Sequence, residues 1–262
     1  MYLETLTDEI EDWIEKAEET ENLRLIHRGE TNHTTGAIAI ELLGYYGSID
    51  KLITKEFLKV SQKSQKIAGF FSNYFNEMIE FSLGEILLPI SVLSLNIGNQ
   101  PYILTTTNFA IPDIICYRLS EELLSFYQQL NVSKIILIDG VYSRYRSLNQ
   151  LPRVHRIISN DFKIHMISEK KSDFSMMGQI ASSFLTYRSQ MPKIPLEIVA
   201  VESFAEYDPI SAYELLKFIN HEFNIDNGLD YIKELADDFK QELNAVHKEE
   251  EEAETLDKFF FT

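Results

Sequence analysis

The sequence has little cysteine, little positive charge and no long apolar run. Cys116 is the only cysteine among 262 residues, which excludes a disulfide within one chain and fits a reducing compartment. The formal net charge is −17, so the chain repels phosphate backbones and anionic lipids, which makes nucleic acids and membranes poor partners. No stretch approaches the ~20 apolar residues that span a bilayer. The acidic first 21 residues do not have the pattern of a signal peptide, so we expect a cytoplasmic protein.

Sequence signatures of common enzyme classes are also missing. There is no Gly-x-Ser-x-Gly, no Gly-x-x-x-x-Gly-Lys-Ser/Thr and no His-Glu-x-x-His. The six histidines are scattered, and no His/Cys cluster has the spacing of metal ligands. Cys116 lies in an apolar run, which favours a buried small side chain over a nucleophile. We therefore expect no catalytic residue, no metal and no cofactor.

Hydrophobic periodicity predicts strands that alternate with helices. We predict strands at 23–28, 67–71, 134–140, 154–159, 163–167 and 196–201. Helices are predicted at 36–46, 113–130, 172–187, 209–222 and 227–248, and Gly98-Asn99 predicts the turn of a hairpin within 84–107. Asp208 followed by Pro209 is a helix N-cap and first position. This order predicts an α/β fold, with a layered mixed sheet flanked by helices.

Two acidic ends flank the predicted domain. Residues 1–22 form a predicted amphipathic helix with acids between the apolar residues Leu3, Leu6, Ile10, Trp13, Ile14 and Ala17. This helix either packs on its own domain or makes an oligomer contact. Residues 23–247 form the predicted α/β domain, and 248–262 a flexible acidic tail. The like-charged run 248–258 is either disordered or an extension of the preceding helix.

The tail ends in Phe259, Phe260, Phe261 and Thr262. Leaving such rings exposed forgoes roughly 1.5–3 kcal/mol of burial per side chain. An apolar cluster on an acidic stalk is typical of a partner-binding segment, although the tail could instead fold back onto a groove of its own domain. Capture of a chain-terminal carboxylate is a recurring recognition mode. We therefore expect these four residues to bind a partner.

A second candidate site combines Asp139, Arg153 and His155. Asp139 ends a continuous apolar run, and open α/β sheets bind ligands at the carboxyl ends of their strands. The alternative is that the cluster of arginines around His155 balances the acidic surface or pairs with acids across an interface; these are Arg144, Arg146, Arg153 and Arg156.

Several segments together resemble the proteasome assembly chaperone family over roughly 84–245. They are Gly84–Thr107 with the helix to Leu130, the run Val132–Gly140, Pro152-Arg153-Val154-His155, and Glu202–Pro209. The end of the chain is similar to the hydrophobic-tyrosine-any motif of proteasome-docking tails, with Phe261 where tyrosine is usual. The glycine-rich turn of the family keeps only its outer residues, Gly29 and Gly36.

The resemblance implies a fold akin to nucleoside phosphorylases that is used without catalysis. It also implies a homo-oligomer that docks its C-terminal tails on α-subunits of the proteasome core particle, as an assembly chaperone or as an activator. Two alternatives remain. One is a small-molecule enzyme of phosphorylase-like fold acting on nucleoside or phosphate compounds near His155. The other is an oligomeric scaffold whose tail serves its own subunits.

Overall fold

The computed structural model describes 23–27, 34–44, 48–72, 74–75, 80–82, 85–87, 89–107, 109–143, 150–160, 163–167, 179–188, 194–223, 225 and 228–260. The amphipathic helix predicted within 1–22 lies outside these residues. Within them, no helix combines the length and apolar character that crossing a membrane requires.

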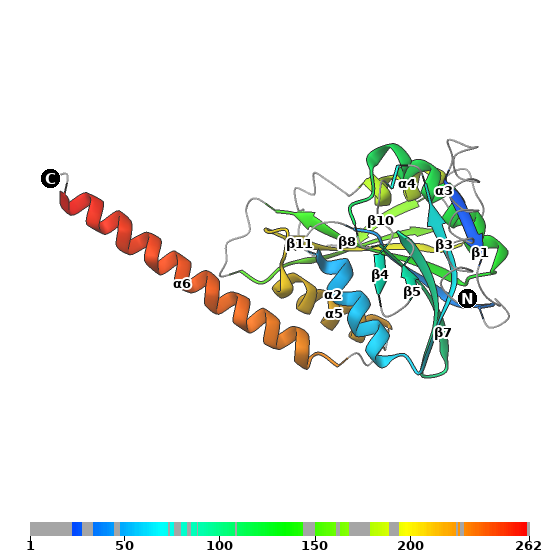
Figure 1. Cartoon of the computed structure of the whole chain (residues 1–262), viewed down its shortest axis with the longest axis horizontal. Coiled ribbons are helices and arrows are strands. Elements are labelled where there is room, and N and C mark those ends of the chain that lie inside the picture. Colours follow the sequence, from blue (N-terminus) through cyan, green and yellow to red (C-terminus); the bar gives the residue numbers. More distant parts are fainter. Residues whose placement is uncertain are drawn as a thin grey trace.

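A nine-stranded mixed sheet forms the centre of the described structure (Figure 1). Its order is β1-β3-β6-β7-β2-β8-β11-β9-β10. The strands are β1 (Arg24–His27), β2 (Ile38–Leu42), β3 (Lys63–Phe71), β6 (Ile90–Ile97), β7 (Gln100–Thr107), β8 (Lys134–Tyr142), β9 (Val154–Asn160), β10 (Lys163–Ile167) and β11 (Leu196–Ser203). The four central strands β7, β2, β8 and β11 run parallel, and antiparallel strands extend the sheet on both sides. A two-stranded sheet pairs β4 (Glu80–Ser82) with β5 (Glu85–Leu87).

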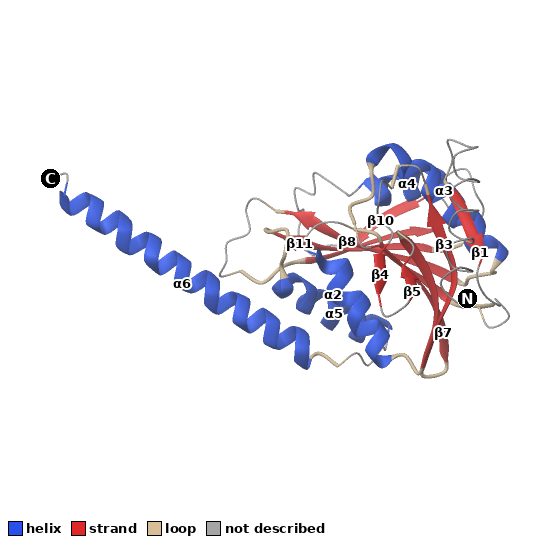
Figure 2. Ribbon diagram, viewed as in Figure 1, coloured by secondary structure: helices blue, strands red, loops and turns tan. Residues whose placement is uncertain are grey.

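Helices cover both faces of the large sheet, as Figure 2 shows. On one face, α3 (Asp113–Gln129) and α4 (Gln179–Arg188) pack over a core that includes Tyr127 and Phe184. On the other, α2 (Ile49–Val60) and α5 (Pro209–Phe223) enclose a second core that includes Phe57 and Leu216. The last helix, α6 (Asp230–Phe260), packs on α5. The predicted layered α/β fold is therefore confirmed.

The central strand β8 follows from its sequence. Its side chains alternate between the two cores, with Leu137 in the α3/α4 core and Ile138 in the α2/α5 core. A strand covered on both faces needs apolar residues at every position, and the run 135–141 is buried throughout.

Local signals for turns and caps are confirmed. Gly98 has φ +59 in the turn between β6 and β7, a conformation that glycine adopts without steric cost. At the start of α5, the backbone N–H of Ser211 donates to Asp208 Oδ1 at 3.0 Å, which satisfies one of the helix's otherwise unpaired donors.

Two sequence predictions were wrong or incomplete in the described structure. The helix predicted at 36–46 is instead strand β2, because Ile40 and Leu42 face one core while Ala39 faces the other. Burial on both faces removes the period-two pattern that marks a half-exposed strand. Helix α2 was not predicted, although its buried residues recur at helical spacing: Ile49, Leu52, Ile53 and Phe57.

Candidate functional site

The residues predicted to bind a partner lie at the outer end of α6. Phe259 and Phe260 are its last two residues, whereas Phe261 and Thr262 lie outside the described residues. For the acidic run 248–258 the sequence allowed disorder or an extension of the preceding helix, and the structure has the extension. Phe259 and Phe260 are thus continuous, through one helix, with the folded domain.

The base of α6 is fixed by packing against the domain. Ile232 is fully buried in the α2/α5 core, and Ala236, one turn further on, is also buried. The ring of Phe239 stacks on Phe204 at a centroid distance of 6.1 Å and meets Tyr207 edge-on at 5.9 Å. Aromatic pairs at such separations add roughly 0.5–1.5 kcal/mol beyond their burial. The corner between β11 and α5 therefore sets the direction in which α6 leaves the domain.

Tyr231 adds a second attachment, this time to α2. The Lys55 ammonium donates to the Tyr231 hydroxyl at 2.9 Å. The Lys55 and Lys59 ammoniums lie 4.0 and 4.1 Å from the centre of the Tyr231 ring, within the range of cation–π attraction. The first turns of α6 are thus held by α2, by α5 and by the corner after β11.

Beyond these contacts α6 extends away from the sheet and its helices (Figure 1). Leu243 is half-buried, and Val246 is 53% exposed. The helix from Leu243 to Phe260 rises by roughly 25 Å at ~1.5 Å per residue. The terminal phenylalanines are consequently carried at the end of a helical arm, which we define as residues 243–260.

The second candidate site lies on the sheet face that α3 and α4 cover. Asp139 on β8 and His155 on β9 both pair with Ala200 of the strand between them, so all three point to the same face. Asp139 is 3% exposed and His155 2%. Their backbones lie about 10 Å apart, two strand spacings. The structure thus places Asp139 and His155 on one face of the sheet, but strand β11 lies between them.

Glu202 links Arg153 and His155, two of the three residues of the predicted site. His155 Nε2 lies 3.4 Å from Glu202 Oε1, and Arg153 Nε lies 3.8 Å from Glu202 Oε2. The backbone N–H of Arg153 also donates to Glu202 Oε2 at 3.3 Å. Sequence reasoning missed Glu202 because the predicted strand ended at 201. The signal was its spacing of two from Ala200, which puts both side chains on one face.

Arg153 and Arg156 do not form one site. Arg156 points to the α2/α5 face, where it pairs with Glu197 and, at 2.7 Å, with Glu222 of α5. Glu197 is buried and also pairs with Lys134 of β8. Arg153 and Arg156 thus pair with acids of their own chain, and pairing across an interface stays a prediction. Arg144 and Arg146 lie outside the described residues.

Buried carboxyl groups accompany Asp139 on the same face. Glu41 on β2 is fully buried, and burial raises the pKa of its carboxyl well above the usual value, while the Thr105 hydroxyl opposes this shift. Close packing surrounds Asp139 too, because a Cβ on Gly44 would lie 2.6 Å from Asp139 Oδ1. Burial thus favours the protonated form of Glu41, which suits a structural role in the core.

The remaining chemical candidates are inert or absent in the described structure. Burial, reinforced by the charge of Asp113, raises the pKa of the Cys116 thiol to about 11, so it remains protonated and unreactive, as its apolar run predicted. Within the part of the chain that the structure describes, no group of three or more His, Cys, Asp or Glu side chains is placed to hold a metal ion.

The described structure is that of a layered α/β protein, with a mixed sheet between two helical layers and a helical arm. Residues 51–247 match the model of the PAC2 family. Because the match spans most of the chain, this protein belongs to the PAC2 family, which confirms the resemblance to proteasome assembly chaperones. No curated protein matches the sequence.

Solved structures share this fold. Pyrococcus furiosus PbaB, an archaeal proteasome activator, is similar with a TM-score of 0.70 and 15% identity over 87% of this chain and 100% of that one. P. furiosus PbaA, an archaeal homolog of proteasome-assembly chaperone, gives 0.64 and 16% over 89% and 100%. A PAC2 family protein from Streptomyces avermitilis gives 0.58 and 15% over 80% and 95%. At these identities the likeness establishes the fold.

Proposed function

We propose that this protein is a non-catalytic proteasome-binding factor, an assembly chaperone or activator, that docks the end of α6 on α-subunits of the core particle. The observation that carries the proposal is the helical arm, which ends in Phe259 and Phe260 away from the domain (Figure 1). Membership of the PAC2 family supports a proteasome-related role, as does the fold shared with PbaB and PbaA.

The chemistry of the chain end suits a pocket between protein subunits. Two aromatic rings of the segment Phe259–Phe261 fill an apolar pocket of the partner. One such tail buries little area, so a single contact is weak. A homo-oligomer presents several tails at once, which raises the avidity by roughly 10²–10⁴-fold if the tails match the spacing of the pockets.

Pull-down of the core particle tests the proposal. Full-length protein is compared with a version that ends at Lys258, and the matched control is Leu151→Ser, which changes a side chain 67% exposed on the domain. We expect the truncation to lose binding and the control to retain it. Analytical ultracentrifugation of all three establishes whether the oligomer is unchanged. Equal binding by full-length and truncated protein would move recognition to the domain and contradict docking by α6.

One observation favours a second candidate, a small-molecule enzyme. His155 and Asp139 are buried on one face, with Glu202 beside His155, toward the carboxyl ends of β8 and β11. A thermal-shift screen with nucleosides and inorganic phosphate tests this candidate against His155→Gln and Asp139→Asn. A ligand that stabilises the wild type but neither variant would support an enzyme or ligand-binding site there.

A further inference from the structure

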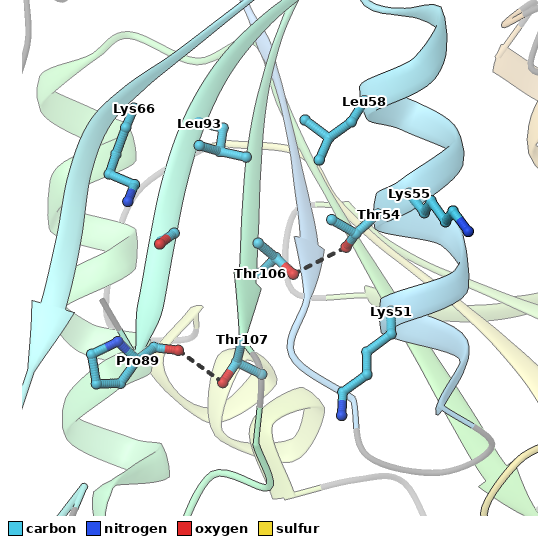
Figure 3. A pocket seen from close by; sticks show the side chains of 10 residues that line it. Lys51, Thr54, Lys55, Leu58, Lys66, Pro89, Leu93, Thr106 and Thr107 are labelled. Atoms are coloured by element: carbon cyan, nitrogen blue, oxygen red, sulfur yellow. Dashed lines mark hydrogen bonds between the residues drawn. The ribbon is translucent and has the colours of Figure 1, made fainter. Parts of the chain in front are cut away.

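A groove on the α2/α5 side of the sheet is not used by the proposed function. It has a volume of about 420 Å³ and lies between α2 and the strands β3, β6 and β7 (Figure 3). Its walls are Lys51, Thr54, Lys55, Leu58, Lys66, Pro89, Ser91, Leu93, Thr106 and Thr107. The groove is on the opposite sheet face from Asp139 and His155.

Positive charge and apolar surface combine in this groove. Three lysines line it although the chain has a net charge of −17. Figure 3 shows Lys51 and Lys66 on opposite sides of the groove, one from α2 and one from β3, while Lys55 points away from it. Leu58 and Leu93 supply the apolar walls, and Leu58 is 40% exposed. A groove with apolar walls and cationic edges is complementary to an acidic amphipathic segment.

The threonine hydroxyls of the walls already have hydrogen-bond partners. Thr54 Oγ1 and Thr106 Oγ1 lie 3.0 Å apart in a hydrogen bond. The Thr107 hydroxyl donates to the Pro89 carbonyl at 3.1 Å. These hydroxyls need no further partner, so apolar contact and the lysine charges dominate what the groove offers to an occupant.

The chain itself contains a segment of matching chemistry. Residues 1–22 carry nine acidic side chains and one lysine. Its apolar residues recur at helical spacing, so a helix over 3–20 would place Trp13, Ile10 and Ile14 on one face and carboxylates beside them. Such a helix fits an apolar groove rimmed by lysines.

Strand β1 brings this segment close to the groove. Arg24 pairs with Phe71 of β3, and the neighbouring Phe70 pairs with Ile90 of β6, next to Pro89. Strand β1 therefore begins at the end of the sheet where Pro89 and Thr107 line the groove. Two strand spacings, about 10 Å, separate β1 from β6, which about three extended residues cover. Such a short tether favours the groove of the same chain over that of a second copy.

We propose that the acidic segment 3–20 docks into the groove of its own chain, with its apolar stripe against Leu58 and Leu93 and its carboxylates beside Lys51 and Lys66. Docking covers apolar surface between α2 and the outer strands. Since the ion pairs lie at an exposed rim, added salt weakens them and releases the segment.

Trp13 is a built-in reporter, because it is the only tryptophan of the chain. We expect its emission in the full-length protein to be shifted to the blue, and its quenching by acrylamide to be reduced, relative to a synthetic peptide of residues 1–22. The double variant Lys51→Glu with Lys66→Glu should weaken docking by at least about tenfold, because two rim attractions become repulsions. Its Trp13 quenching then approaches that of the peptide.

The matched control makes the same change of charge outside the groove, in Lys63→Glu with Lys233→Glu. We expect its Trp13 quenching to equal that of the wild type, and circular dichroism should show that both double variants are folded. Trp13 as accessible in the wild type as in the peptide would overturn the proposal, as would protection that persists after reversal of Lys51 and Lys66. Protection that falls on dilution would place the segment on a second copy and refute docking within one chain.

Discussion

The two halves of α6 differ in what holds them. The first half, through Phe239, is packed against α2, α5 and the corner after β11. The second half extends from the domain, with Val246 already exposed. The base therefore sets the direction of the helix, and in the proposed function the outer end binds the partner. A mutation at the base should change both stability and binding, whereas a mutation in the arm should change binding alone.

The largest combined effect is expected at Phe239. Phe239→Ala removes the ring that Phe204 and Tyr207 contact, and the half-buried position makes a loss of about 2 kcal/mol reasonable. Freed from this corner, α6 samples many directions, so binding to the core particle should fall roughly tenfold. Urea unfolding and a binding titration measure the two effects. Phe239→Leu is the control that keeps apolar volume, and it should recover most of the stability.

A break in the arm should affect binding without affecting the domain. Ala253→Pro interrupts a helix interior, at a local cost of ~3 kcal/mol to the helix. If the arm has to hold the phenylalanines at a set distance, binding should fall several-fold while the urea midpoint stays constant. Ala253→Gln keeps the helix and serves as the control. Unchanged binding by the proline variant would show that the arm needs reach but not rigidity.

The smallest effect concerns the domain alone, through the buried carboxyl of Glu41. Burial raises the pKa of this carboxyl, so the folded state keeps a proton that the unfolded chain loses above about pH 4.5, the ordinary pKa of a glutamate side chain. The unfolded state then binds fewer protons, so stability falls as pH rises until the folded carboxyl itself ionises. Burial also raises the pKa of Asp50, from 3.8 to about 6. Below pH 6 this carboxyl therefore also makes the unfolding free energy fall as pH rises.

Glu41→Gln should therefore flatten the decline of unfolding free energy as pH rises. Unfolding in urea at several values between pH 5 and pH 8 measures the slope, and Asp50→Asn is the comparison that should flatten it only below pH 6. Neither substitution should alter binding of the arm to the core particle. An unaltered slope in Glu41→Gln would mean that this carboxyl ionises in the folded protein.

The sequence predicted correctly those strands and turns whose residue pattern is produced by only one kind of structure. The run 135–138 is apolar at every position because β8 is buried on both faces. Gly98-Asn99 marks the turn between β6 and β7 through the backbone freedom of glycine. Strand β2 was missed because burial on both faces also hides the alternation that distinguishes a short strand from a helix.

The sequence reveals some features of the two candidate sites and not others. The terminal phenylalanines can be recognised from sequence, since an acidic run provides no core to bury them. The direction of α6 cannot be recognised from sequence, because it depends on contacts of Phe239 with residues about 30 positions earlier in the chain. The pairing of His155 with Glu202 depends on the order of strands β9 and β11, which the sequence does not specify.

Photo-crosslinking from the end of the arm tests the central claim most directly. A benzoylphenylalanine replaces Phe260, the protein is mixed with core particle and irradiated, and the crosslinked peptides are identified by mass spectrometry. We predict crosslinks to α-subunits of the core particle, suppressed by an excess of unmodified protein but not by the version that ends at Lys258. Crosslinks confined to this chain or to other copies of it would contradict docking and favour a tail that serves its own subunits.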